Sequence, residues 1–145
     1  MIKLGDLAPN FVATATDGRV IELAKLRGKT VVLYFFPRAF TSGCTLETQR
    51  FRDSYPSFQR LGAEVIGIST DALERQCRFA VQHGVPFPLV GDASKQISRA
   101  YGVLHWSRVF DKRVTVIVDH DGRVKLVIED EPARHAERAQ AAIGS

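Results

Sequence analysis

The stretch that decides the fold spans residues 31–47 and reads VVLYFFPRAFTSGCTLE. Its first six residues are a continuous apolar run, typical of a strand buried on both faces of an α/β sheet. Pro37 ends this strand because it has no N–H to donate to a neighbouring strand. A short polar loop follows, and Cys44 opens a predicted helix. We therefore expect Cys44 at a strand-to-helix junction, where backbone N–H groups and the helix dipole make a thiol acidic and nucleophilic.

Length and composition limit the class of protein. The 145 residues suit one domain, so we expect residues 1–145 to form a single unit. With 45% apolar and 25% charged residues, the chain has the composition of an ordinary soluble globular protein. The net charge of +4 comes from Lys and Arg scattered among acids, which argues against nucleic-acid binding.

The cellular compartment is predicted to be the cytoplasm. No apolar run approaches the ~20 residues of a membrane span, and the first residues lack the pattern of a signal peptide. The two cysteines, Cys44 and Cys77, are too few for a disulfide framework. In a reducing compartment such cysteines are more often free, catalytic or redox-active.

The rest of the chain alternates between strand and helix patterns. The expected elements are a hairpin at 10–23, a helix at 41–61, a strand at 64–69, helices at 72–83 and 95–101, a hairpin at 113–129 and a helix at 135–143. Pro56 is expected to kink or divide the first helix, and Thr70 or Asp71 to cap the second. Strands linked by helices pair in parallel, and the late hairpin adds an antiparallel strand. The predicted fold class is therefore α/β, with a mixed central sheet and helices on both faces.

A set of motifs resembles the peroxiredoxins, which are thiol peroxidases on a thioredoxin-like fold. The spacing Pro37-x-x-x-Thr41-x-x-Cys44 matches their active-site signature. The likeness covers almost the whole chain, through Gly5-x-x-Ala8-Pro9-x-Phe11, the Pro-Phe-Pro at 86–88 and Arg113-x-Thr115-x-x-x-Asp119. Residues 43–47 look like the bacterioferritin-comigratory (Q) subgroup, whereas residues 36–41 look more like the alkyl-hydroperoxidase-E-like subgroup.

The resemblance implies catalytic roles for residues around the cysteine. Cys44 would attack one peroxide oxygen as a thiolate while the other oxygen leaves. Thr41, one helical turn earlier, would reach both the sulfur and the bound peroxide. Gly43 would let backbone N–H groups approach the peroxide, and Pro37 would cover the pocket and limit water. A lone cysteine at a helix start is more often a small buried residue, and Thr41 alone reads as a helix cap.

Arg113 is the distant member of the implied site. It begins an antiparallel strand at the end of the sheet where the 31–36 strand finishes. A guanidinium there would stabilise the thiolate and the charge that develops on the leaving oxygen. Glu47 would orient this arginine, although it fits a capping-box role equally well. Taken singly each residue has an ordinary structural explanation, but their combination favours a peroxide site.

The thiol that resolves the oxidised cysteine is less evident. A sulfenic acid must react with a thiol or be over-oxidised. Many Q-type members carry the resolving cysteine five residues on, where this chain has Gln49. Cys77 lies on the following helix, about one turn from the usual family position near Ala80. It also shares a helix face with Leu73, Ala80 and Val81, which predicts burial.

Two alternatives therefore stay open for Cys77. It could form a disulfide with Cys44, which would require local unfolding because the two sulfurs must come within ~2 Å. Alternatively it is an inert core cysteine, and an external thiol resolves Cys44. The resemblance implies thioredoxin, glutaredoxin or a low-molecular-weight thiol as the reductant.

No metal site is expected, because the histidines at 83, 105, 120 and 135 lack ligand spacing, and the resemblance implies no bound organic cofactor. Phe40, Trp106 and Phe110 are candidates for a dimer interface or for ordinary core packing, so the protein is expected to be a monomer or a homodimer.

One rival function is a thioredoxin-like disulfide oxidoreductase, disfavoured because Glu47 stands where a second cysteine would complete Cys-x-x-Cys. The other is a non-enzymatic binding or holdase protein with a passive cysteine.

Overall fold

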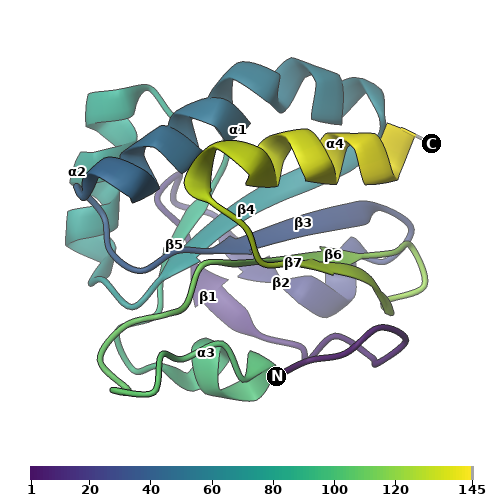
Figure 1. The fold of residues 1–145 in the computed structure, drawn as a ribbon, viewed down its shortest axis with the longest axis horizontal. Coiled ribbons are helices and arrows are strands. Elements are labelled where there is room, and N and C mark those ends of the chain that lie inside the picture. Colours follow the sequence, from purple (N-terminus) through teal and green to yellow (C-terminus); the bar gives the residue numbers. More distant parts are fainter. Residues whose placement is uncertain (145) are drawn as a thin grey trace.

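The computed structural model describes residues 1–144, which form a five-stranded mixed sheet with helices on both faces (Figure 1). The strands of this sheet are β3 (Thr30–Phe35), β4 (Ala63–Ser69), β5 (Leu89–Gly91), β6 (Val114–Val118) and β7 (Val124–Ile128). A separate hairpin is formed by β1 (Val12–Thr14) and β2 (Val20–Glu22). The helices are α1 (Ser42–Arg60), α2 (Leu73–His83), α3 (Gln96–Tyr101) and α4 (His135–Gly144), with 3₁₀ turns η1 (Leu23–Leu26) and η2 (Pro132–Arg134). The predicted fold class is confirmed.

The sheet order β5-β4-β3-β6-β7 places β3 at the centre. β3 pairs in parallel with β4 and antiparallel with β6, so Phe35 lies opposite Ile68 on one side and Val114 on the other. The end of β3 therefore meets the start of β6. This register confirms that Arg113, directly before β6, lies at the edge of the sheet where the 31–36 stretch finishes.

The side chains of β3 alternate between two hydrophobic cores. Val32 and Tyr34 face the layer of α1, α2 and α4, where the rings of Tyr34 and Phe51 stack at a centroid distance of 4.4 Å. Val31, Leu33 and Phe35 face the opposite layer, built from the β1–β2 hairpin, η1 and α3. Figure 1 shows α1 and α4 above the sheet and α3 with the hairpin below it. The continuous apolar run of this strand is explained because both of its faces are covered.

Two details of the helices differ from the prediction. Pro56 lies inside α1, yet α1 is one helix of 19 residues, so the division of this helix is not seen, and a kink at Pro56 stays a prediction. The proline removes one helical hydrogen bond, while the buried rings of Phe51 and Phe58 pack 5.9 Å apart and hold the two halves together. The N-cap of α2 is Ala72, with no side-chain cap, so the capping role predicted for Thr70 or Asp71 is wrong.

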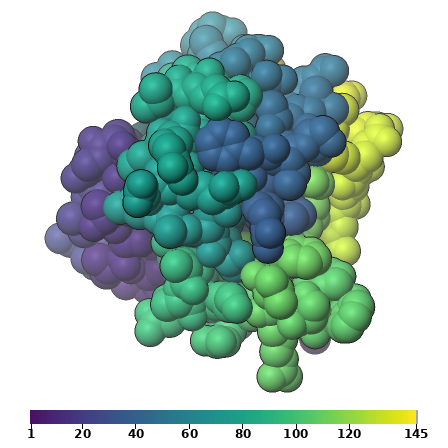
Figure 2. Space-filling model, turned by 90° about the vertical axis from the view of Figure 1, so that its left-hand side faces the viewer, coloured from purple at the N-terminus to yellow at the C-terminus, as the bar shows by residue number. Residues whose placement is uncertain are grey.

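The loop between α3 and β6 projects from the molecule. Figure 2 shows this segment, in green, standing out below the α2 region and beside the blue start of α1. Trp106 on this loop is 86% exposed. Within the described residues, none of the helices combines the length and the apolarity that a membrane crossing requires.

Candidate active site

Cys44 is the third residue of α1 and is fully buried in the core between α1 and the sheet. Thr41 is the N-cap in an extended conformation, so the chain turns into the helix immediately before the thiol. The first backbone N–H groups of a helix have no acceptors within the helix, and its N-terminus carries a partial positive charge. The predicted strand-to-helix placement of Cys44 is confirmed.

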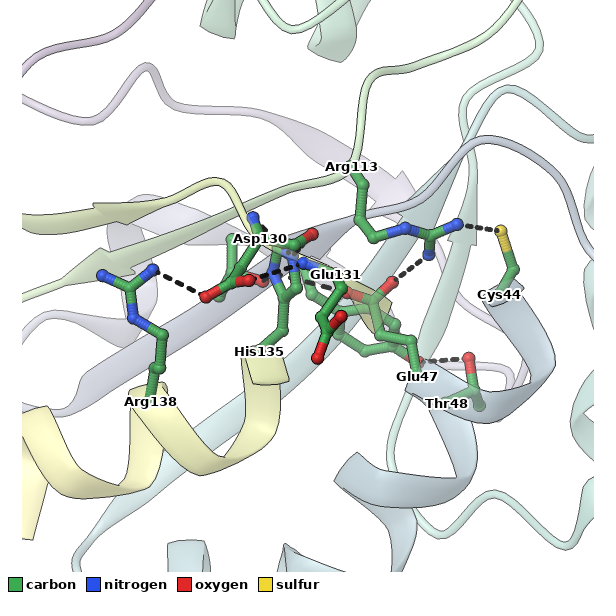
Figure 3. Close-up of polar contacts among 10 residues, drawn as sticks. Cys44, Glu47, Thr48, Arg113, Asp130, Glu131, His135 and Arg138 are labelled. Carbon is green, nitrogen blue, oxygen red and sulfur yellow. Dashed lines mark hydrogen bonds and ion pairs between the residues drawn. The ribbon is translucent and has the colours of Figure 1, made fainter. Parts of the chain in front are cut away.

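Arg113 links the thiol to a buried carboxyl group (Figure 3). Its Nη2 donates a hydrogen bond to Cys44 Sγ at 3.6 Å, and its Nη1 donates to Glu47 Oε1 at 2.9 Å. Glu47 lies one turn after Cys44 on α1 and is fully buried. One guanidinium therefore bridges sulfur and carboxyl, and the structure brings together three of the residues that the sequence singled out.

Gly43 makes room for this guanidinium. A Cβ at this position would lie 3.0 Å from Arg113 Nη2 and 3.2 Å from Pro132 Cγ. The sequence suggested that the missing side chain serves the approach of peroxide to the backbone. The geometry gives it a second effect, because a Cβ there would crowd the guanidinium and displace it by a few tenths of an ångström.

Thr41 and Pro37 lie in the loop between β3 and α1. The Thr41 hydroxyl donates to the carbonyl oxygen of Arg38 at 2.7 Å rather than to the cysteine. Its one proton is thus engaged, and its lone pairs stay available to accept a hydrogen bond from a peroxide O–H. Pro37 is half-buried directly after the strand.

The same loop is held by α2 and the turn before it, through contacts that the sequence did not predict. Phe40 has a φ of 68°, a left-handed conformation that is unfavourable for a non-glycine residue. The backbone N–H of Ala39 donates to Asp71 Oδ2 at 2.8 Å, and Arg75 donates to the Ala39 carbonyl at 3.1 Å. The Arg75 guanidinium also lies 5.0 Å from the centre of the Phe40 ring. These contacts hold the loop in its strained form, and no local sequence pattern predicts contacts between segments so far apart.

Behind the arginine lies a buried acid–base pair. Burial raises the pKa of Glu47 to about 8, although Arg113 opposes the shift. The side chain of His135, also fully buried, has its Nδ1 at 3.4 Å from Glu47 Oε2. Burial lowers the pKa of His135. The sequence treated His135 only as a histidine without ligand spacing, because a partner 88 positions away leaves no local pattern.

Comparison with known proteins shows which protein family has this fold and site. Residues 4–127 match the family model described as the AhpC/TSA family. The chain belongs to this family of peroxiredoxins. A chloroplastic peroxiredoxin Q from Sedum lineare is 38% identical over 139 residues, covering 92% of this chain and 74% of that protein. The chloroplastic relatives from Sedum, rice and wheat are matched over 63% to 74% of their own length.

Solved peroxiredoxin structures share the whole fold. The crystal structure of peroxidoxin BcpB from Mycobacterium tuberculosis superposes with a TM-score of 0.92 at 33% identity, covering 99% of this chain and 97% of that one. Xanthomonas campestris bacterioferritin comigratory protein, described for its alkyl peroxide reduction activity, gives 0.89 at 26% identity, with 99% and 96% covered. The protein is therefore a thiol-dependent peroxidase on a thioredoxin-like fold, and the rival functions are not favoured.

Cys77 of this peroxiredoxin lies on the side of α2 that faces away from the thiol site. Phe79, fully buried, packs against Phe40 with ring centroids 5.2 Å apart. Because successive helical residues are turned by about 100°, Cys77 lies nearly opposite to Phe79 on the helix. It is half-buried and, with Thr16 and Val81 among others, lines a shallow pocket of about 340 Å³. The predicted buried face is wrong for Val81, which is 82% exposed, and Cys77 is not a core residue.

The aromatic residues proposed for an interface are unequally exposed. Trp106 is largely exposed and Phe40 is 37% exposed, whereas Phe110 is half-buried and stacks on His105 at 4.5 Å. Their role in dimerisation stays a prediction. Within residues 1–144, no three His, Cys, Asp or Glu side chains are grouped so that they could hold a metal ion.

Proposed function

We propose that residues 1–145 form a single peroxidase domain in which Cys44 is the nucleophile that reduces hydrogen peroxide and organic hydroperoxides. Arg113, Thr41 and Pro37 complete the catalytic site, and Glu47 supports it. The observation that carries the proposal is the contact of Arg113 Nη2 with Cys44 Sγ at the start of a helix. A guanidinium and a helix N-terminus both stabilise negative charge on sulfur.

The reaction is a displacement on oxygen. The Cys44 thiolate attacks the terminal oxygen of the hydroperoxide, the S–O bond forms and the O–O bond breaks. The second oxygen departs with the electron pair and takes up a proton, giving water or an alcohol, while sulfur is oxidised to sulfenic acid. Arg113 donates hydrogen bonds where this negative charge develops, and Thr41 accepts one from the peroxide O–H. Pro37 limits the access of water to the sulfur.

A thiol then resolves the sulfenic acid. Its sulfur attacks Cys44 Sγ, a disulfide forms, and the hydroxyl leaves as water. This thiol is either Cys77 or an external thiol of thioredoxin, glutaredoxin or a low-molecular-weight compound. The orientation of Cys77 favours the external thiol as long as α2 stays helical, because a bridge to Cys77 needs that helix to unwind.

The free thiols bear on the cellular location of the protein, and the exposed aromatic residues bear on its assembly. A peroxidase with two free thiols suits a reducing compartment, so we place it in the cytoplasm. It works as a monomer or as a homodimer, and exposed Trp106 and Phe40 are the candidate contacts of a dimer.

Stopped-flow consumption of peroxide by the reduced protein tests the proposal. We expect one equivalent to be consumed rapidly in a single turnover, and a Cys44→Ser variant to be inactive. A Cys44→Ser variant that reacts as fast as the native protein would refute the assignment. Repeating the assay with thioredoxin, glutaredoxin or glutathione identifies the reductant that sustains turnover.

A further inference from the structure

The projecting loop between α3 and β6 carries an open pocket that is separate from the thiol site. The loop stands out from the body of the molecule in Figure 2. The pocket has a volume of about 560 Å³, within the usual range of small-molecule sites. Its lining includes Arg99, His105, Trp106 and Arg108, whereas Cys44 is not part of it. The peroxide chemistry therefore does not explain this pocket.

A stack of aromatic rings ends in an exposed indole at this pocket. The rings of Phe110 and His105 stack with centroids 4.5 Å apart, and the Trp106 ring lies 5.0 Å from that of His105. The stack supports Trp106 from one side, yet Trp106 is 86% exposed. A flat ligand that covers the indole would therefore gain both apolar burial and ring stacking.

The charged groups around this indole are basic. Among residues 93–112 the basic side chains are Lys95, Arg99, Arg108 and Lys112, and the one acid, Asp111, is fully buried. Within residues 1–144, neither Arg99 nor Arg108 forms an ion pair with a carboxylate. The net charge of the chain hides this local cluster, because acids elsewhere offset it. A free aromatic face beside unpaired guanidinium groups favours an aromatic anion as the ligand.

Hydrogen bonds within the loop hold these groups in place. The backbone N–H of His105 donates to the Phe110 carbonyl at 2.8 Å, and that of Arg108 donates to the His105 carbonyl at 2.8 Å. Lys95, at the start of α3, donates through Nζ to the Arg108 carbonyl at 2.9 Å. The loop is thus tied both to itself and to α3. A site that is ordered before it binds a ligand loses less conformational entropy on binding.

We propose that this pocket binds a nucleoside phosphate, with the base stacked on Trp106 and the phosphate held by Arg99 and Arg108. A nucleobase is a flat ring system that stacks on aromatic side chains, and guanidinium groups bind phosphate oxygens through paired hydrogen bonds. The same unit occurs in a free nucleotide and in a single nucleic-acid strand, so the experiment uses a probe of each kind. This site goes beyond the peroxidase function and does not require a reactive Cys44.

Intrinsic fluorescence tests the proposal, because Trp106 is the one tryptophan of the chain. Titration with AMP should quench the emission to saturation. Adenosine, which has no phosphate, should bind about fivefold or more weakly, and ribose 5-phosphate, which has no base, should leave the emission unchanged. A short single-stranded oligoadenylate that binds more tightly than AMP would identify a strand as the source of the ligand. Equal affinities would identify the free nucleotide.

Substitutions of exposed residues assign the contacts. Arg99→Ala and Arg108→Ala should each weaken AMP binding by about fivefold to tenfold, since each removes a charged donor to the phosphate. The matched control is Arg60→Ala, because Arg60 is an exposed arginine that lines a different pocket. Its affinity for AMP should equal that of the native protein. Trp106→Ala, measured by equilibrium dialysis with radiolabelled AMP, should lose measurable binding.

Several results would overturn the proposal. One is quenching that does not saturate, and another is equal affinity for AMP and adenosine. A third is an Arg108→Ala variant that binds AMP as tightly as Arg60→Ala does. A second copy of the chain seated on Trp106 would make the emission depend on protein concentration and not on AMP, which also contradicts the proposal. Cys44→Ser should bind AMP like the native protein, so this test is independent of the peroxidase assignment.

Discussion

Gly43 and Arg113 show how single residues create the reactive centre. The guanidinium occupies the space that a side chain at position 43 would need, and it contacts sulfur and carboxyl with separate nitrogens. Two hydrogen-bonding nitrogens in a fixed plane are a property of arginine that lysine lacks. The reactive centre therefore needs the missing side chain at position 43 as well as the two separate nitrogens of Arg113.

The first prediction concerns Gly43→Ala. The added Cβ would lie 3.0 Å from Arg113 Nη2 and force the guanidinium to move. We expect the rate constant for peroxide consumption to fall about threefold to tenfold, since displacing the guanidinium lengthens its 3.6 Å contact with Cys44 Sγ. Stopped-flow kinetics measure the effect, and a rate within twofold of the native value would contradict it.

The second prediction concerns Arg113→Lys. A lysine keeps the charge but cannot bridge Cys44 and Glu47 at the same time. We expect the single-turnover rate to fall by about 10²–10³, the loss typical of removing a donor aimed at developing negative charge. Retention of most of the activity would show that a point charge is sufficient and that the bridging geometry is not needed.

At the scale of elements, α2 and the turn directly before it support the loop that carries Thr41. Asp71 and Arg75 bind the backbone of Ala39 from both sides, and Arg75 also lies against the Phe40 ring. The positive φ of Phe40 persists because these contacts hold it. The loop conformation thus depends on a helix that begins some 30 residues later.

The third prediction tests this support with Arg75→Ala. We expect the free energy of unfolding to fall by about 1–2 kcal/mol, because a charge-assisted hydrogen bond and a cation–π contact are lost. Peroxide consumption should slow as well, since the loop carrying Thr41 is loosened. The control is Arg78→Ala on the same helix, whose exposed pair with Glu74 at 4.0 Å should contribute less than about 0.5 kcal/mol. Equal effects of the two variants in urea unfolding would argue against the proposed support.

At the scale of the whole molecule, two buried carboxyl groups link stability to pH. Burial, with the nearby Asp92 and Asp71, raises the pKa of Asp111 to about 7, although the Ser98 hydroxyl opposes the shift. Glu47 has a pKa of about 8. A carboxyl group whose pKa is raised by folding binds its proton more tightly in the native state. Its stabilising contribution is complete below pH 3.8, the unfolded pKa of Asp111, and is lost as the pH rises through about 7.

The fourth prediction is that Asp111→Asn removes the part of the pH dependence of stability that Asp111 contributes. The native protein should lose roughly 2–4 kcal/mol of unfolding free energy through Asp111 between about pH 4 and pH 8. The variant should keep only the loss that comes from Glu47, so its total loss over this pH range should be smaller than that of the native protein. Urea unfolding at a series of pH values measures both slopes, and parallel curves for the two proteins would contradict the prediction.

The sequence predicted most of the sheet and the local half of the site. The apolar run at 31–36 and the register of Pro37, Thr41 and Cys44 are short-range patterns, so they could be recognised directly. Arg113 was placed correctly because the strand order implied which end of the sheet it occupies. The contacts of Arg75, His135 and Gly43 were missed, since each depends on a residue brought near only by the tertiary fold. Pro56 does not divide α1, because a proline inside a helix removes one hydrogen bond while packing on both sides of it is kept.

Intact mass spectrometry after one equivalent of hydrogen peroxide tests the central claim most directly, namely that Cys44 is the residue that peroxide oxidises. The account predicts a gain of about 16 Da on Cys44, or a loss of about 2 Da if Cys77 then forms a disulfide with it. Cys44→Ser should keep its mass under the same conditions. An unchanged mass in the native protein, or the same oxidation in Cys44→Ser, would contradict the account.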